Sequence, residues 1–248
     1  MSSPPAGPRA WVPLHRIGAA PTRARFVERP HRFAARCELA SGELVEAHLP
    51  NPGRLTGTAA PGREVLLDGP LGDPRRSLQW TCLAMREPTA WVGTVTTAAN
   101  RALPLLLEAG LLPELGAPTR LEPEVRHGHS RFDWRLTLPS GEPLWVEVKS
   151  ATLGEGRTVS FPDAVTARGS RHLSELAELA RAGDRCAVVF VAQRADVRAF
   201  RAAREIDPAF ADALEAAAAA GVTILAASLR IGPRGMQVHR RLELALDP

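Results

Sequence analysis

A run of seven apolar residues, from Cys186 to Ala192, places the strongest constraint on how this chain can fold. A strand that is apolar on both faces must be covered on both, which is typical of the centre of a sheet between helices. Two predicted helices can cover this strand. One has leucines at helical spacing over 166–182, and the other begins at Asp207-Pro208 and ends at Gly221. The other predicted strands lie at 121–126, 131–138, 144–151 and 222–227. The sequence therefore predicts an α/β domain with a mixed sheet.

The N-terminal part has a different pattern, in which turn residues separate short strands. These strands are predicted at 23–27, 32–39, 43–49, 64–67 and 78–85. Five short strands with Gly- and Pro-rich turns favour a small β-barrel. Because the apolar spacing changes between residues 86 and 96, we expect a flexible arm over 1–15, a barrel over 16–90 and the α/β domain over 91–248. A helix is expected between Thr97 and Gly110, with a kink or break at Pro104.

Lys149 is the single lysine of the chain, and the other 30 of the 31 Lys and Arg residues are arginines. In such a composition, a position that keeps lysine is one where arginine does not serve. The lysine ammonium is a compact point charge, whereas the arginine guanidinium is a planar fork. Lys149 is therefore a candidate functional residue.

Glu147 and Lys149 lie two residues apart in the predicted strand 144–151, so their side chains share one face. Val146 and Val148 alternate with them and point to the opposite, buried face. A carboxylate beside an ammonium on a strand flanked by core residues suggests a site that binds something. The alternative is an ordinary surface ladder, in which Glu147 and Lys149 pair in solvent.

The turn from Leu138 to Glu142 predicts the register of the strand before it. Its sequence is that of a type I turn followed by Gly141 in the left-handed position of a bulge. Counting back along the hairpin from this turn brings Asp133 opposite Glu147. Paired side chains lie about 5 Å apart at Cβ, so these two carboxylates would repel each other without a cation between them.

Mg²⁺ binds hard oxygen ligands, commonly one or two carboxylates with water and substrate phosphate. We therefore expect Mg²⁺, or Mn²⁺, on Asp133 and Glu147, with the Val148 carbonyl and Glu124 as further candidate ligands. The ion would neutralise a phosphodiester and activate a water. Lys149 would orient that water or stabilise charge on the phosphate. Asp133, Glu147 and Lys149 are thus the predicted catalytic residues, and no small-molecule cofactor is expected.

Several motifs resemble those of the sugar fermentation stimulation protein A family. They are Val146–Leu153, Phe161–Gly169, His172–Leu176, Pro50–Gly57 and Ile206–Pro208, in that family's order along most of the chain. The resemblance implies an N-terminal OB-fold-like barrel and a C-terminal domain of the PD-(D/E)xK restriction-endonuclease-like fold. It also implies DNA binding and a role in regulating sugar metabolism, and it places Asp133, Glu147 and Lys149 on the nuclease motif.

Basic and polar residues in both parts are candidates for nucleic-acid contacts. On the predicted helix 166–182, Arg168 and His172 share a face and could reach phosphates, with a solvated helix face as the alternative. On the barrel, the 50–57 turn is equally open to phosphate contacts and to simple turn chemistry. Phe26, Phe33 and Trp80 are possible stacking residues, although placement in the core is favoured for them. The full candidate set is Arg32, Arg36, Asn51, Arg54, Thr166, Arg168 and His172.

Composition supports a cytoplasmic protein with a polyanionic partner. The net charge of +4 is compatible with nucleic acid, DNA more than RNA, and neither a secretory signal nor an apolar membrane span is found. Cys37, Cys82 and Cys186 are too widely spaced to suggest a disulfide framework or a zinc site. The sequence predicts a metal-dependent nuclease. A non-catalytic DNA-binding regulator and an RNA-processing factor remain as alternatives, and the sequence predicts no oligomeric state.

Overall fold

The apolar run forms β12 (Arg185–Ala192), which lies between two parallel neighbours as a buried central strand, as predicted. The structure is a computed structural model that describes residues 10–14, 20–127 and 130–245. Its main sheet has the order β15-β14-β12-β9-β8-β7, in which β14, β12 and β9 are parallel and the rest antiparallel. The other strands are β7 (Arg120–His127), β8 (Ser130–Thr137), β9 (Pro143–Ala151), β14 (Thr223–Gly232) and β15 (Gly235–Arg241).

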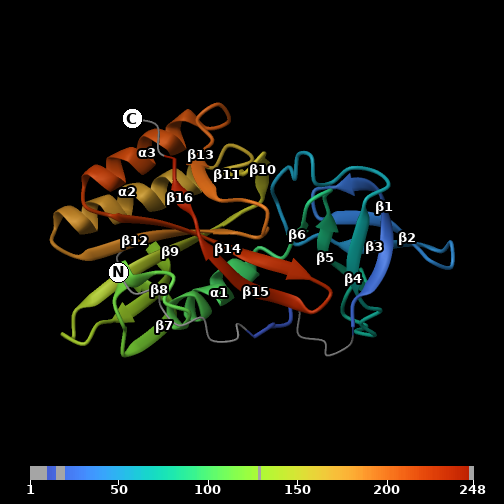
Figure 1. Cartoon of the computed structure of the whole chain (residues 1–248), viewed down its shortest axis with the longest axis horizontal. Helices are drawn as coiled ribbons and strands as arrows, with labels where there is room; N and C mark the ends of the chain where they lie inside the picture. The colour runs from blue at the N-terminus through green and yellow to red at the C-terminus, as the bar shows by residue number, and fades with distance from the viewer. Residues whose placement is uncertain (1–9, 15–19, 128–129, 246–248) are drawn as a thin grey trace.

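Helices cover both faces of this sheet. On one face, α1 (Thr97–Glu108) packs with Val146 and Val148 of β9. On the other, α2 (Ala167–Arg181) and α3 (Pro208–Ala219) lie side by side (Figure 1) and pack with Trp145. The two faces of β9 therefore belong to two separate hydrophobic clusters, which fixes β9 in the middle of the domain.

The two helices on the α2 side begin at capping residues that hold each other. Thr166 accepts a hydrogen bond from Gly169 N at 3.1 Å, and Asp207 accepts one from Phe210 N at 3.1 Å. Asp207 also accepts from Thr166 N at 2.7 Å, so the two helix starts are joined. The expected helices are confirmed within a residue or two at each end.

The expected break in the first helix is wrong, because α1 runs through Pro104 without interruption. A proline inside a helix removes one backbone hydrogen bond to the residue four positions earlier. Leu103 and Leu106, on either side of Pro104, are fully buried against the sheet. Their burial holds the helix together across the missing bond.

The N-terminal part is a closed barrel, as predicted. Its strands have the order β3-β2-β1-β4-β5-β6, and pairing between β3 and β5 closes it. They are β1 (Thr22–His31), β2 (Ala34–Leu39), β3 (Leu44–His48), β4 (Glu64–Asp68), β5 (Trp80–Arg86) and the short β6 (Trp91–Gly93). The strand expected from Arg32 begins only at Ala34, so Arg32 lies in the β1–β2 turn and does not share a strand face with Arg36.

A second, four-stranded sheet was not predicted. It lies between α3 and the barrel (Figure 1) and has the order β10-β11-β13-β16. Its strands are β10 (Leu153–Glu155), β11 (Thr158–Phe161), β13 (Ala199–Ala202) and β16 (Glu243–Leu244). The hairpin partner β15 and a single 3₁₀ turn at Pro113–Leu115 were missed as well.

The expected flexible N-terminal arm needs correction over its described part, residues 10–14. Val12 exchanges two backbone hydrogen bonds with Met236 of β15, at 2.8 and 2.7 Å. Leu14 is buried, and Arg101 of α1 donates to the carbonyls of Pro13 and Leu14. This segment is therefore packed on the α/β domain. Residues 1–9 and 15 of the expected arm lie outside the described residues.

The three cysteines are buried free thiols. Burial raises the pKa of Cys37 and of Cys186 to about 12, which keeps these thiols protonated and unreactive. None of the helices in the described ranges is long and apolar enough to cross a membrane.

Candidate active site

The β8–β9 hairpin has the predicted register. Leu138 N donates to Glu142 O at 2.9 Å, and Gly141 has the left-handed φ of 88° that the bulge requires. Trp134 pairs with Val146. The ladder ends at this pair, so the predicted pairing of Asp133 with Glu147, one position further along, is not part of it.

The hydrogen-bonded ladder between β8 and β9 is interrupted at Asp133, and the carboxylate of Asp133 takes the place of a backbone acceptor. Val148 N donates to Asp133 Oδ2 at 2.8 Å, so the side chain replaces a backbone acceptor of the neighbouring strand. Phe132 packs in the cluster on the α2 side, whereas Trp134 packs against the cluster on the α1 side, so β8 changes face here. The expectation that Asp133 stands beside Lys149 on the Glu147 face is thus corrected: the carboxylate points at the backbone of β9.

Asn100 of α1 holds the second oxygen of Asp133. Its amide nitrogen donates to Asp133 Oδ1 at 2.7 Å, and its own oxygen accepts from Trp134 Nε1 at 2.8 Å. These two bonds determine which way the Asn100 amide is turned. Asn100 was not predicted, although a poor helix former among alanines and leucines was a usable indication.

Glu147 is 3% exposed and makes two contacts through one oxygen. Its Oε1 accepts from Lys149 Nζ at 2.6 Å and lies 2.6 Å from His172 Nδ1. Arg168 Nε donates to the other ring nitrogen of His172, at 3.4 Å. We therefore assign the imidazole proton to Nδ1, so that His172 donates to Glu147. The other oxygen, Oε2, is buried and has no hydrogen-bond partner.

The two carboxylates differ in their electrostatic surroundings. Burial raises the pKa of Asp133, the charge of Glu147 raises it further, and the hydrogen bonds from Val148 N and Asn100 offset only part of this. Burial also acts to raise the pKa of Glu147, but the hydrogen bond from His172 and the charge of Lys149 outweigh it and hold that pKa below its ordinary value. Glu147 is thus the stably ionised member of the pair.

The residues around this pair fit a hard divalent cation. Buried polar atoms are almost always hydrogen-bonded, so the unpartnered Oε2 of ionised Glu147 is an atom that could bind a cation. Each Asp133 oxygen accepts one hydrogen bond and keeps a second lone pair. In an extended strand the carbonyl of Val148 points to the same side as its N–H, toward Asp133. Two carboxylates and a carbonyl leave room for the water and phosphate ligands that Mg²⁺ commonly retains.

Glu124 does not join this group. It lies on β7 in register with Asp133, but its backbone has a φ of 55°, and its exposed side chain pairs with Arg131 at 3.5 Å. Within the described ranges no cluster of three or more His, Cys, Asp or Glu side chains could hold a metal ion. A cation here would therefore depend on two carboxylates.

The predicted nucleic-acid residues fall into two sets. Arg32, Arg54 and Arg168 are exposed, and His172 is the buried partner of Glu147. The other three have structural partners: Thr166 caps α2, Asn51 Oδ1 accepts from Gly53 N at 2.8 Å, and Arg36 pairs with Glu28 and Glu46. The charge of Arg36 is thus compensated, and Asn51 performs the turn chemistry that was the alternative for it.

A loop of the barrel docks on the segment that leads into α2. Arg29 holds this loop by donating to the carbonyls of Asn51, Gly53 and Arg54. Asp163, three residues before the α2 cap, accepts from Leu55 N at 3.2 Å. A Cβ on Gly53 would lie 2.2 Å from the Asp163 carboxylate, so a larger residue there would displace that carboxylate. Two motifs 108 residues apart in sequence therefore meet, a contact that sequence reasoning missed.

A buried ionic group also joins the two parts of the molecule. Arg194, whose side chain is 4% exposed, follows β12 and pairs with Glu87 at 2.7 Å and Asp196 at 2.8 Å. It also donates to Thr152 O at 3.1 Å, just beyond β9. Because Glu87 follows the barrel strand β5, this cation ties the barrel to the end of the strand that carries Glu147 and Lys149.

Comparison with known proteins agrees with this architecture. Residues 27–94 match the SfsA N-terminal OB domain, and residues 97–235 match the sugar fermentation stimulation protein RE domain. The chain belongs to the sugar fermentation stimulation protein family. The resemblance found in the sequence and the predicted OB-like and α/β folds are thereby confirmed.

Individual members of the sugar fermentation stimulation protein family match over nearly their full length. The homolog of Ruegeria pomeroyi is 42% identical over 219 residues, covering 87% of this chain and 94% of that protein. The Pseudomonas putida homolog is 42% identical over 231 residues, covering 91% of this chain and 97% of that protein. Pyrococcus furiosus SfsA, solved in complex with Ca²⁺, has a TM-score of 0.82 at 29% identity, covering 94% of this chain and 99% of that one.

Proposed function

We propose that this protein is a metal-dependent nuclease that hydrolyses phosphodiester bonds in nucleic acid, DNA rather than RNA. Asp133, Glu147 and Lys149 would be its catalytic residues. The observation that carries the proposal is the buried, unpartnered Oε2 of an ionised Glu147, beside a second carboxylate and the single lysine of the chain. If Glu147 and Lys149 formed an ordinary ion pair on the surface, both carboxylate oxygens of Glu147 would contact water, and neither would be buried without a partner.

Asp133, Glu147 and the Val148 carbonyl would hold Mg²⁺ or Mn²⁺. The bound ion would supply charge neutralisation of the phosphodiester and a more acidic water. The related Pyrococcus furiosus protein was solved with Ca²⁺, which prefers oxygen ligands as Mg²⁺ does. That complex supports a hard cation in this family.

The chain's own residues prepare the site. His172 and Lys149 both donate to Glu147 Oε1, which keeps the carboxylate ionised and leaves Oε2 free. Asn100 and Val148 N hold Asp133 in place. A lysine ammonium has three donors, and Glu147 takes one, so two remain to orient a water or to stabilise charge on a phosphate oxygen. Arg168, exposed beside His172, adds positive charge for the substrate.

A cleavage assay tests the proposal directly. Labelled single-stranded and duplex DNA and RNA are incubated with Mg²⁺, Mn²⁺ or EDTA, using wild type, Lys149→Ala and Arg204→Ala. Arg204 serves as the matched control, since it is paired with Asp212 and Glu215 on the outside of α3. We expect cleavage by wild type and Arg204→Ala with metal only, and none by Lys149→Ala. Binding without cleavage on every substrate would instead support the DNA-binding regulator. A cytoplasmic location is part of the proposal, in keeping with three buried free thiols.

A further inference from the structure

Phe33 is an aromatic side chain that the barrel leaves in solvent. It is 44% exposed and lies in the turn between β1 and β2, whereas Phe26 is buried in the barrel core and Trp80 packs against it. Loops at this end of an OB fold bind oligonucleotides in many proteins. The position of Phe33 alone does not indicate a ligand, but the residues around it do.

The turn that carries Phe33 is held rigidly. Leu49 N donates to Phe33 O at 2.8 Å, and Arg29 donates to Arg32 O at 2.6 Å. Arg32 in turn donates to Pro52 O at 2.9 Å, and its guanidinium lies 5.5 Å from the centre of the Phe33 ring. The backbone of the turn is thus held in place, and the Arg32 guanidinium lies over one face of the Phe33 ring, which leaves the other face for a stacked group.

Two arginines near Phe33 differ from several others on the barrel in having no ion pair within the described ranges. Arg23, Arg25 and Arg36 are each paired with a glutamate. Arg32 and Arg54 are exposed, and among the described residues neither forms an ion pair. Free guanidinium groups beside an exposed ring are complementary to a polyanion that also carries flat aromatic groups.

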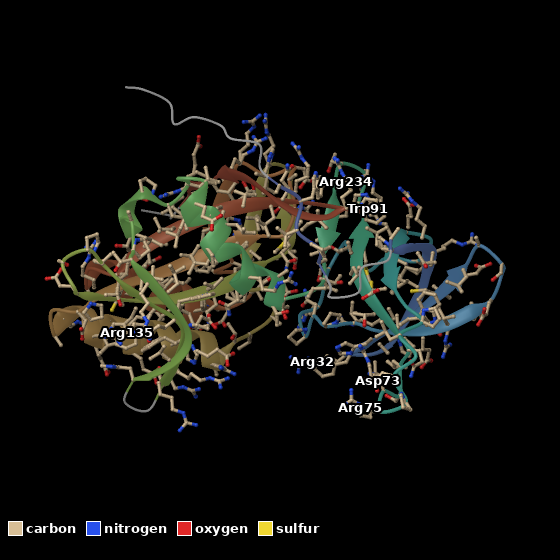
Figure 2. The ribbon with its side chains drawn as sticks, turned by 90° about the horizontal axis from the view of Figure 1, so that it is seen from below. Arg32, Asp73, Arg75, Trp91, Arg135 and Arg234 are labelled. Atoms are coloured by element: carbon tan, nitrogen blue, oxygen red, sulfur yellow. The ribbon has the colours of Figure 1, made fainter. Side chains whose placement is uncertain are left out.

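The same loop leads to the candidate active site. Arg32 lies at the boundary between the barrel and the α/β domain (Figure 2), where the loop over residues 50–57 contacts Asp163. From Asp163 the chain enters α2, on which Arg168 contacts His172 and His172 contacts Glu147. The turn that carries Phe33 is therefore linked through the 50–57 loop and α2 to the carboxylates, and Arg32, Arg54 and Arg168 are exposed along this link.

We propose that Phe33 is a stacking site for an unpaired base, so that the nucleic acid is single-stranded where it crosses the barrel. Arg32 and Arg54 would bind the flanking phosphates. A base inside a duplex is already stacked on both faces, whereas a base in a single strand can place one face on a protein ring. This inference rests on the nucleic-acid binding of the proposed function and names its substrate class: a single strand, or a duplex with an unpaired end.

Binding is measured without metal ions, so that the nucleic acid is not cleaved during the measurement. Fluorescence anisotropy compares a 20-nucleotide strand with its duplex, for wild type, Phe33→Ala, Phe33→Trp and Leu44→Ala. Leu44 is a matched control because it is 60% exposed on the same barrel but begins the strand after the β2–β3 turn. Loss of one stacked base weakens binding by roughly tenfold or more. We expect that loss for Phe33→Ala on the single strand only, full affinity for Phe33→Trp, and no effect of Leu44→Ala.

Abasic nucleotides identify the stacked base. At one position of the strand, removing the base should weaken wild-type binding as much as Phe33→Ala does, and the variant should lose nothing further from that removal. Equal single-strand affinity of wild type and Phe33→Ala, with nucleic-acid binding intact, would overturn the stacking site and leave the proposed function standing. Absence of binding to every nucleic acid would overturn both.

Discussion

His172 Nδ1 and Glu147 Oε1 lie 2.6 Å apart in the interior of the protein, joining α2 to the strand β9. Because Lys149 donates to the same oxygen, all of the hydrogen bonding that Glu147 receives is concentrated on one side of its carboxylate. The other oxygen, Oε2, is buried and has no hydrogen-bond partner. The orientation of Glu147 is thus set by residues on two elements before any cation binds.

The free energy of unfolding of Glu147→Gln should change less with pH in the acid range than that of wild type. The folded-state pKa of Glu147 lies below its ordinary value of 4.5, so its ionised form stabilises the fold above that pH. This contribution is lost as pH falls through the folded pKa. We expect the variant to unfold with about 2 kcal/mol less free energy at pH 7, and the gap to narrow below pH 4.5. Urea unfolding from pH 7 to 3.5 measures this, with the exposed Glu178→Gln as control. A gap that stays constant with pH would contradict it.

Removal of the His172 imidazole should weaken metal binding. A residue that orients a ligand without touching the metal typically contributes 10–100-fold in metal affinity. We expect a loss of about that size for His172→Ala, measured by calorimetric titration with Mn²⁺. His172→Asn keeps an N–H near the Nδ1 position and should recover part of the affinity. Equal Mn²⁺ affinity in wild type and His172→Ala would show that His172 serves packing alone.

Lys149→Arg should abolish cleavage while nucleic-acid affinity stays within a few-fold. The Lys149 side chain is 13% exposed and is held 2.6 Å from Glu147, so a planar fork has no room to replace a point ammonium. Paired measurements of cleavage rate and affinity on one oligonucleotide decide this. Near wild-type cleavage by the arginine variant would show that only the charge matters.

Arg194→Met should destabilise the protein by about 3 kcal/mol, because it leaves two largely buried carboxylates without their cation. Urea unfolding is the measurement. Arg75→Met is the control, since Arg75 pairs with Asp73 on the outer surface of the barrel (Figure 2) and should cause no measurable change. Similar midpoints for the two variants would mean that the buried group does not hold the two parts together.

The features that sequence predicted correctly depend on local rules. The sequence of the Leu138–Glu142 turn specifies the turn type, and counting from that turn gave the register of β8 against β9 as far as Trp134 and Val146. The apolar run of β12 required burial on both faces, and capping residues marked the starts of α2 and α3. Each of these depends on a few adjacent residues.

The features that sequence did not predict depend on distant partners. The direction of the Asp133 carboxylate is set by Asn100, 33 residues earlier, and that of Glu147 by His172, 25 residues later. Arg36 is neutralised by Glu46, which reaches it only because β2 and β3 pair. The small second sheet consists of strands of two to four residues, too short to show a period and held by neighbours remote in sequence.

The contact between Val12 and Met236 has a practical consequence for handling the protein. β15 is the last strand of the main sheet, and an exposed edge strand offers unpaired N–H and C=O groups to another copy of the chain. The two hydrogen bonds from Val12 occupy that edge, and Gly235 packs so closely that an added Cβ would lie 2.1 Å from the Val12 carbonyl. A chain shortened to begin at residue 20 would expose this edge, and on purification we expect it to aggregate through β15.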